Sequence, residues 1–245
     1  MFAVGNKIKN FVEEFGGLRI YRHTLPHGVD CFADLQRRLR SQSVSVVFDV
    51  GANRGQSALE YLQKFPNAEI YCFEPVAATF QALQAATSNS RRVHAYQLGM
   101  GEAVGETTIS ANPEATLSSI KLKLPDGHSE PIRLDTIAKF AENNSIETID
   151  FLKIDTEGYE MEVLRGAESL LKLQRIRLIF IECEPVERFE RFTSFSKLAD
   201  YLGGFGYRLF GIYDQSFAPS VGNSICYCNV LFACDSLTSP KQGPT

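Results

Sequence analysis

Short apolar runs alternate with amphipathic helical segments along most of this chain, and that alternation restricts the possible folds more than any other feature. The run at 44–50 is apolar up to Asp49 except for Ser45 and is closed by Gly51, the pattern of a strand buried on both faces. Further strands are expected at 70–73, 93–98, 149–155, 176–183, 207–212 and 226–233, and helices at 55–64, 76–86, 134–143, 159–171 and 196–202. This order predicts an α/β fold, in which right-handed crossovers build a mostly parallel sheet with helices on both faces.

The length of the chain fits one large domain with additions. A prior of about 150 residues per domain gives fewer than two domains for 245 residues. We expect an N-terminal helical extension at 1–43, an α/β domain at 44–235 and a flexible polar tail at 236–245. Alternating residues at 104–110 predict a hairpin excursion within the domain.

Composition and charge exclude several classes of function. The 25 basic and 29 acidic residues give a net charge of −4 without a basic block, so we expect no nucleic-acid partner. No run approaches the length of a membrane helix, and the N-terminus does not resemble an export signal. The cysteines are scattered, and Cys226 and Cys228 are too close together for a zinc site, so we expect buried free thiols and a cytoplasmic protein. Nothing in the sequence indicates an oligomeric state.

The loop after the first strand, Val47-Phe-Asp-Val-Gly-Ala-Asn-Arg-Gly-Gln56, carries only two glycines, Gly51 and Gly55. It lacks the third glycine of a dinucleotide fingerprint and the lysine of a P-loop. Asp49 would repel a pyrophosphate but attract an ammonium or sulfonium group. The loop therefore favours S-adenosylmethionine, with its amino group meeting Asp49 directly or through a water and its carboxylate facing the helix N-terminus.

Glu74 ends the second strand, where a carboxylate in nucleotide-binding α/β sheets accepts hydrogen bonds from ribose hydroxyls. Each signal has a simpler alternative: Glu74 can be a solvated residue before Pro75, and the glycines can serve only a tight turn. Both signals in the expected order, together with Asp49, favour an adenosyl ligand.

A second group of polar residues lies in the segment 151–167. Strand alternation places Lys153 and Asp155 on one side of the strand, and Asp155 ends it, where the transferable methyl group is expected. Lys153 in a strand core requires a partner, most simply a neighbouring carboxylate. Glu182 closes the next strand and can reach the same cleft. The alternative is that Thr156 or Glu157 only caps the following helix.

Several of these segments together resemble the FkbM family of S-adenosylmethionine-dependent methyltransferases. The matching strings are Phe48-Asp-Val-Gly-Ala-Asn-Arg-Gly-Gln56, Cys72-Phe-Glu-Pro75, Leu134-Asp135, Phe151-Leu-Lys-Ile-Asp-Thr-Glu-Gly158, Glu162-Val-Leu-Arg-Gly-Ala167 and Ile179-Phe-Ile-Glu182. The resemblance implies a class I methyltransferase, Rossmann-like sheet with a late antiparallel strand, and O-methylation of sugars, glycolipids or polyketide-like hydroxyls.

By motif position, the resemblance assigns Asp49, Gly51, Asn53 and Gly55 to the cofactor loop and Glu74 to the ribose contact. The chain departs from the family at Leu98-Gly-Met-Gly-Glu102, where a small residue followed by Asp is common, so the contacts to the adenine stay unassigned.

Methylation of an alcohol requires a base or a cation, because the hydroxyl does not readily lose its proton. Asp155 is our first candidate for taking the proton or orienting the hydroxyl, with Glu182 second and Lys153 beside them. An alternative is that Asp155, Glu157 and Glu182 bind Mg²⁺. Three other functions stay open: a methyltransferase acting on protein or nucleic acid, a non-catalytic binding module with this fold, and a nicotinamide-dependent oxidoreductase, which the two-glycine loop disfavours.

Overall fold

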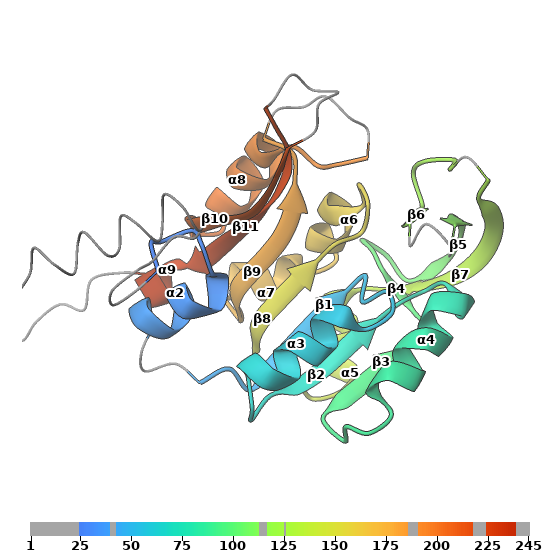
Figure 1. Cartoon of the computed structure of the whole chain (residues 1–245), viewed down its shortest axis with the longest axis horizontal. Coiled ribbons are helices and arrows are strands. Elements are labelled where there is room, and N and C mark those ends of the chain that lie inside the picture. The colour runs from blue at the N-terminus through green and yellow to red at the C-terminus, as the bar shows by residue number, and fades with distance from the viewer. Residues whose placement is uncertain are drawn as a thin grey trace, which may run out of the picture.

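The structure of the chain is a computed structural model that describes residues 25–39, 43–112, 117–124, 126–185, 191–217 and 224–238. A seven-stranded sheet carries helices on both sides, and a separate four-stranded sheet stands beside its carboxyl edge (Figure 1). The predicted α/β fold class is confirmed.

The seven-stranded sheet has the strand order β10-β11-β9-β8-β1-β2-β3. Its strands are β1 (Val46–Val50), β2 (Glu69–Phe73), β3 (Val93–Tyr96), β8 (Ile149–Ile154), β9 (Ile176–Cys183), β10 (Tyr207–Phe217) and β11 (Ile225–Cys234). The pairs from β3 to β9 are parallel, whereas β11 is antiparallel to both β9 and β10. The late antiparallel strand that the family resemblance implied is therefore present.

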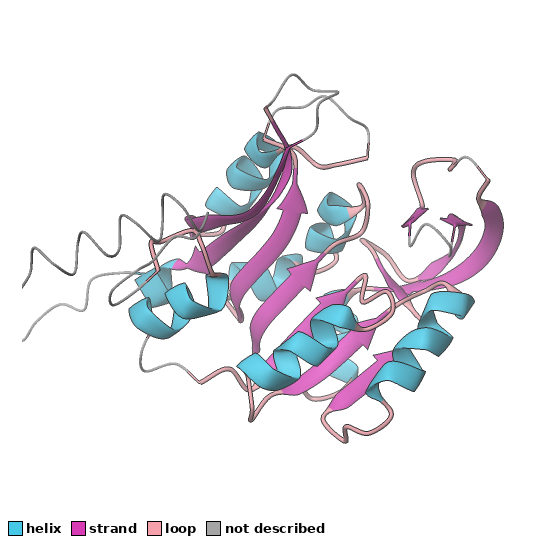
Figure 2. Ribbon diagram, in the orientation of Figure 1, coloured by secondary structure: helices cyan, strands magenta, loops and turns pink. Residues whose placement is uncertain are grey.

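Helices cover both faces of this sheet (Figure 2). They are α2 (Cys31–Arg38), α3 (Gln56–Lys64), α4 (Ala77–Thr87), α5 (Ile137–Asn143), α6 (Glu160–Arg165), α7 (Glu168–Lys172), α8 (Phe195–Gly203) and α9 (Asp235–Thr238). Buried residues of α2, α3 and α4 pack in one core, and those of α5 to α8 pack in the other. Alternate residues of each strand enter the two cores, as strands buried on both faces require. Across the described ranges, every helix is too short or too polar to cross a membrane.

The expected hairpin excursion is larger than the sequence pattern indicates. Strands β4 (Gly99–Met100), β5 (Gly105–Asn112), β6 (Leu117–Ser119) and β7 (His128–Asp135) form a sheet of order β4-β7-β5-β6. The sequence analysis missed β7, because its first residues are polar and exposed and it contains Pro131. The helix predicted from residue 134 begins only at Ile137, after the side chain of Thr136 accepts a hydrogen bond from Lys139 N.

The single helix predicted over 159–171 is wrong, because the structure has two short helices there, α6 and α7, interrupted at Gly166 and Ala167. A Cβ atom at Gly166 would lie 1.9 Å from the carbonyl oxygen of Gly101. The close approach of these two backbones explains both the glycine and the interruption. Residues 236–238 of the expected tail belong to α9, and 239–245 lie outside the described residues.

Part of the expected N-terminal extension packs directly on the α/β domain. Residues 1–24 and 40–42, which include the first predicted helix, lie outside the described residues, but α2 contributes Cys31 and Leu35 to the core. The buried carboxylate of Asp34 in α2 accepts a hydrogen bond from Gly28 N, just before the helix, at 2.8 Å. It accepts another from the Tyr213 hydroxyl of β10 at 3.1 Å. Arg37 forms an ion pair with the same carboxylate, and Nδ1 of His27 lies 3.0 Å from its Oδ2.

Candidate active site

A cavity of about 680 Å³ opens at the carboxyl ends of the central strands. This is the edge at which open α/β sheets bind ligands. The cavity brings together most of the candidate residues from distant segments. Those that line it are Gly51, Asn53, Glu74, Lys153, Asp155, Glu157 and Glu182. Asp49 and Gly55 are not among its lining residues.

The loop after β1 needs its glycines for packing and for backbone conformation. Gly51 has φ +82°, and a Cβ atom there would lie 1.9 Å from the carbonyl oxygen of Asp155. Gly55 has φ +90° at the N-cap of α3, and its Cβ would lie 2.9 Å from a methyl group of Leu83. Asn53 also has a positive φ of 48°. Gly51 thus lets the first loop lie against the end of β8, so that both segments face one cavity, whereas Gly55 lets the start of α3 lie against α4.

Asp49 lies behind this loop and is completely buried. Neither carboxylate oxygen accepts a well-formed hydrogen bond from the residues that the structure describes. Burial raises the pKa of Asp49, while the Lys153 ammonium and Ser57 oppose that rise. This buried carboxylate, with so little compensation, lies close to Ser57 and two residues before Gly51, and both of these residues line the cavity.

Glu74 is held in a fixed orientation at the end of β2. Its Oε1 accepts hydrogen bonds from Val76 N at 3.0 Å and from the Thr79 hydroxyl at 2.7 Å, and its Oε2 accepts one from Asn53 N at 3.0 Å. Burial raises the pKa of Glu74, and these three donors oppose the rise. A carboxylate offers about four acceptor sites, so these donors leave one site of this cavity-lining residue unused.

The predicted pairing of Lys153 is confirmed. Its Nζ lies 2.8 Å from Oδ2 of Asp155, the residue that follows β8. Burial lowers the pKa of Lys153, but the negative charges of Asp155 and Asp49 outweigh that effect and raise it above its ordinary value. The raised pKa favours the charged form of Lys153, which balances the negative charges of Asp155 and Asp49.

Asp155, Glu157 and Glu182 converge, with one oxygen of each within 4.8 Å of the others. Burial raises the pKa of Glu182 to about 8, and the charges of Asp155 and Glu157 add to that rise. Arg191, which the sequence analysis missed, bonds both oxygens of Glu157, with Nη2 at 2.7 Å from Oε1. Only the fold brings Arg191 here, because it belongs to the segment after β9.

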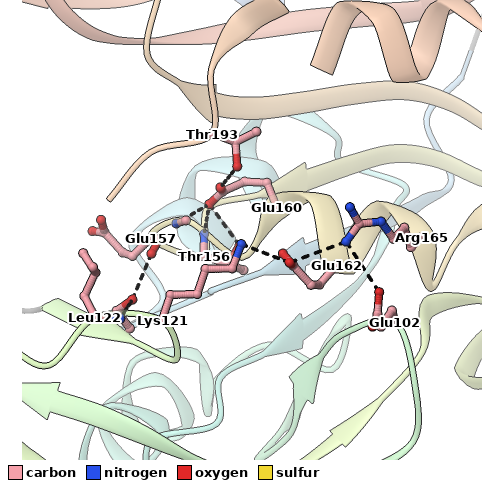
Figure 3. A network of polar contacts seen from close by, with 11 residues as sticks. Glu102, Lys121, Leu122, Thr156, Glu157, Glu160, Glu162, Arg165 and Thr193 are labelled. Atoms are coloured by element: carbon pink, nitrogen blue, oxygen red, sulfur yellow. Dashed lines mark hydrogen bonds and ion pairs between the residues drawn. The ribbon is translucent and has the colours of Figure 1, made fainter. Parts of the chain in front are cut away.

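The alternative in which Thr156 or Glu157 caps the next helix is wrong, because α6 begins at Glu160 with Tyr159 at its N-cap and no side-chain cap. Glu160, which is 2% exposed, instead organises the turn (Figure 3). Its Oε1 accepts hydrogen bonds from Thr156 N, the Thr156 hydroxyl and Gly158 N, and its Oε2 accepts one from the Thr193 hydroxyl at 2.6 Å.

Residues of the four-stranded sheet and of the segment after its strand β6 contact the turn after β8 and helix α6. The Ser119 hydroxyl donates a hydrogen bond to the carbonyl oxygen of Glu157 at 3.0 Å, and Lys121 pairs with Glu162 of α6 at 3.0 Å (Figure 3). Ser118 and Ile120, on either side of Ser119, line the cavity. The small sheet therefore forms one wall of the site.

A mostly parallel seven-stranded sheet with one late antiparallel strand, and with a glycine loop and acidic residues at its carboxyl edge, defines a class I S-adenosylmethionine-dependent methyltransferase domain. The profile of the methyltransferase FkbM domain matches residues 49–209, well over half of the chain. The chain belongs to the FkbM methyltransferase family.

Characterised relatives are similar over part of their length. Methyltransferase 1 of Beauveria bassiana is 28% identical over 51% of this chain and 59% of its own length. The hexuronic acid methyltransferase AglP of Haloferax volcanii is 28% identical over 56% of this chain and 55% of its own length. The 31-O-demethyl-FK506 methyltransferase FkbM of Streptomyces tacrolimicus is 29% identical over 71% of this chain and 76% of its own length. The chain thus spans less than two thirds of the first two of these relatives.

Proposed function

We propose that this protein is an S-adenosylmethionine-dependent O-methyltransferase that acts on a hydroxyl of a sugar, glycolipid or polyketide-like small molecule. The main support is one cavity that joins the loop after β1 and Glu74 to the convergent carboxylates Asp155 and Glu182. The names of two relatives, a hexuronic acid methyltransferase and an FK506 O-methyltransferase, support the class of acceptor. A cytoplasmic location and the absence of a nucleic-acid partner are part of the same proposal.

The residues of the first loop fit the cofactor. The Gly51–Asn53 backbone and Glu74 line one half of the cavity, and Glu74 keeps one acceptor site for a ribose hydroxyl. Asp49 lies beneath the loop, so it would act on the amino group of the cofactor through Ser57 or a water rather than directly. The cofactor supplies an activated methyl group on a positively charged sulfur.

The acceptor hydroxyl would lie between Asp155 and Glu182. Orientation of that oxygen toward the methyl carbon is the main requirement of the reaction. Its proton would pass to Asp155, whose charge Lys153 balances, or to Glu182 when that group is ionised. Because the pKa of Glu182 is raised to about 8, it carries a proton at neutral pH, and Asp155 is then the available base.

The same three carboxylates could instead bind Mg²⁺, an ion that prefers oxygen ligands. Two observations favour the proton-transfer alternative: Lys153 already pairs with Asp155, and Arg191 with Glu157. A calorimetric titration of the protein with Mg²⁺ alone separates the two alternatives. Submillimolar binding that Glu182→Gln abolishes would favour the metal.

The proposed function is tested by binding and turnover of two variants. Asp155→Asn should bind S-adenosylhomocysteine within a few-fold of the wild-type affinity but lose methyl transfer from labelled S-adenosylmethionine across a panel of hydroxylated acceptors. Glu74→Ala should weaken cofactor binding. Binding of NAD in preference to S-adenosylhomocysteine would refute the assignment, and full activity of Asp155→Asn would remove that residue from the reaction.

A further inference from the structure

The cavity extends beyond the part proposed for the cofactor, at the loop after β1 and Glu74. It also extends beyond Asp155 and Glu182, where the methyl group would be transferred and which we call the transfer point. Its far end is lined by residues from the start of α2, from α3 and from β10 and β11, the last two strands of the chain. Those that bear on the argument are Asp30, Phe32, Glu60, Asp214, Tyr227 and Asn229. The FkbM domain match ends at 209, so the part of this wall formed by β11 and by Asp214 lies outside it.

Sheet register aligns a polar row from the transfer point to this far end. Asn229 of β11 pairs with Glu182 of β9 on one side and with Tyr213 of β10 on the other. The Asn229 amide donates a hydrogen bond to Asp214 Oδ2 at 3.0 Å. Since neighbouring strands lie about 4.8 Å apart, the row continues for about 10 Å beyond Glu182, enough to contact a second part of the acceptor.

The charges along the cavity are strongly unequal. Its lining carboxylates are Asp30, Glu60, Glu74, Asp155, Glu157, Glu182 and Asp214, and its lining bases are Lys153 and Arg191. Both bases already pair with carboxylates near the transfer point. The cofactor adds one net positive charge, which is too little to balance the rest.

The acidic side chains at the far end lie near one another. Burial raises the pKa of the Cys31 thiol at the start of α2, and the negative charges of Asp214, Asp30, Asp34 and Glu60 raise it further. Lys153 and Arg191, the basic side chains of the described cavity wall, pair with Asp155 and Glu157 rather than with these acids. A ligand group placed here therefore meets carboxylate and amide acceptors together with the rings of Phe32 and Tyr227.

We propose that the row Glu182–Asn229–Asp214, together with Asp30 of the same cavity, is a distal acceptor subsite that takes a neutral or amine-bearing polyhydroxylated group and rejects one that carries a carboxylate or phosphate. The inference rests on the proposed function, because it assumes that the acceptor hydroxyl lies at Asp155 and Glu182. Hydroxyls and ammonium groups donate to these acceptors, whereas like charges repel across a binding site.

The test uses the full chain saturated with S-adenosylhomocysteine and three methyl β-D-glycosides of one ring type: the glucoside, the 2-amino-2-deoxyglucoside and the glucuronide. Dissociation constants are measured at low ionic strength from NMR shifts of the Asn229 side-chain amide. We expect the amino sugar to bind at least as tightly as the glucoside, and the glucuronide to bind about tenfold more weakly or worse.

The double variant Asp30→Asn/Asp214→Asn removes the charge while preserving the local structure. Asparagine is an equally good N-cap at position 30, where the side chain accepts from Ala33 N, and it tolerates the positive φ of 47° at position 214. The ratio of glucuronide to amino-sugar dissociation constants should fall about tenfold, with the glucoside almost unchanged. The exposed Asp200→Asn on α8 is the control and should behave as wild type.

Three results would overturn the inference: glucuronide binding as tight as that of the glucoside, a ratio that the double variant does not change, or no glycoside binding at the Asn229 amide. Calorimetry with S-adenosylhomocysteine distinguishes a failure of the distal subsite from a failure of the proposed function. Normal cofactor binding with a negative glycoside result removes only the subsite, whereas absent cofactor binding removes the function itself.

Discussion

Individual side chains at the strand ends are arranged so that three carboxylates can share a small volume. Asp155 is balanced by Lys153, and Glu157 by Arg191. Glu182 has no comparable ion pair within the described residues, and its pKa rises to about 8 instead. A raised pKa is the expected response of a carboxyl group that is buried beside like charges. Protonation of Glu182 thus removes the negative charge that a third cation would otherwise have to balance.

The titration of Glu182 tests this account. In carbon-detected NMR, its carboxyl resonance should titrate with a midpoint of about 8. Glu157→Gln should lower that midpoint, because removal of a neighbouring negative charge favours the ionised form and leaves the Arg191 cation nearby. Glu106→Gln, on the exposed part of β5, should leave it unchanged. A midpoint near the ordinary value of 4.5 would contradict the proposed charge balance.

At the level of elements, the central strands could be predicted because apolar runs closed by glycine or a carboxylate have few alternatives. The pairing of Lys153 followed from the cost of burying an unpaired charge. Arg191 and Glu160 could not be assigned, because their roles depend on contacts with segments that are distant in sequence or on the shape of a turn. The interruption between α6 and α7 was missed for the same reason: its cause, the backbone of Gly101, lies more than sixty residues away.

Gly166→Ala should therefore be destabilising. Its new methyl group would lie 1.9 Å from the Gly101 carbonyl oxygen, and the backbones must separate. Overpacking of this kind costs about 1–3 kcal/mol in the free energy of unfolding, which denaturant titration measures. Gly203→Ala is the matched control, since nothing lies within 4 Å of its added Cβ at the end of α8. Equal stability of the two variants would show that the Gly101 contact is not rigid.

The turn after β8 depends on Glu160. Glu160→Ala would leave the donors of Thr156, Gly158 and Thr193 without their acceptor and should lower the free energy of unfolding by about 1–3 kcal/mol. We expect faster hydrogen exchange at the Gly158 amide. Glu160→Gln, which keeps an acceptor oxygen, should change exchange less. Glu162→Ala, in the same helix but paired with Lys121 and Arg165, serves as control. Unchanged protection of Gly158 in Glu160→Ala would contradict this role.

On the scale of the whole molecule, the cavity is built from both ends of the described chain. The segment before and within α2 and the strand β10 lie on the same side of the site, and Asp34 joins them through Gly28 N and the Tyr213 hydroxyl. His27 of the same segment contacts the carbonyl oxygen of Phe210 at 2.7 Å. Asp34, together with the core contacts of Cys31 and Leu35, therefore helps to hold Asp30 and Asp214 at the same cavity.

Asp34→Asn should loosen this connection and lower the free energy of unfolding by about 1–3 kcal/mol. Burial alone would raise the pKa of Asp34, but the hydrogen bonds from Gly28, Arg37 and Tyr213 outweigh it and lower that pKa below 3.8. A lowered pKa means that the stabilisation is complete above 3.8 and is lost as the pH falls through the folded-state value.

The stability difference between wild type and Asp34→Asn should then be constant from pH 7 down to about 5 and shrink at more acidic pH. Urea titrations across this range measure it, with Asp200→Asn as the exposed control. Since Asp34 lies outside the cavity lining, cofactor affinity should stay near wild type while binding at the distal subsite weakens. A variant as stable as wild type at pH 7 would mean that α2 is held to β10 by apolar contacts rather than by this carboxylate.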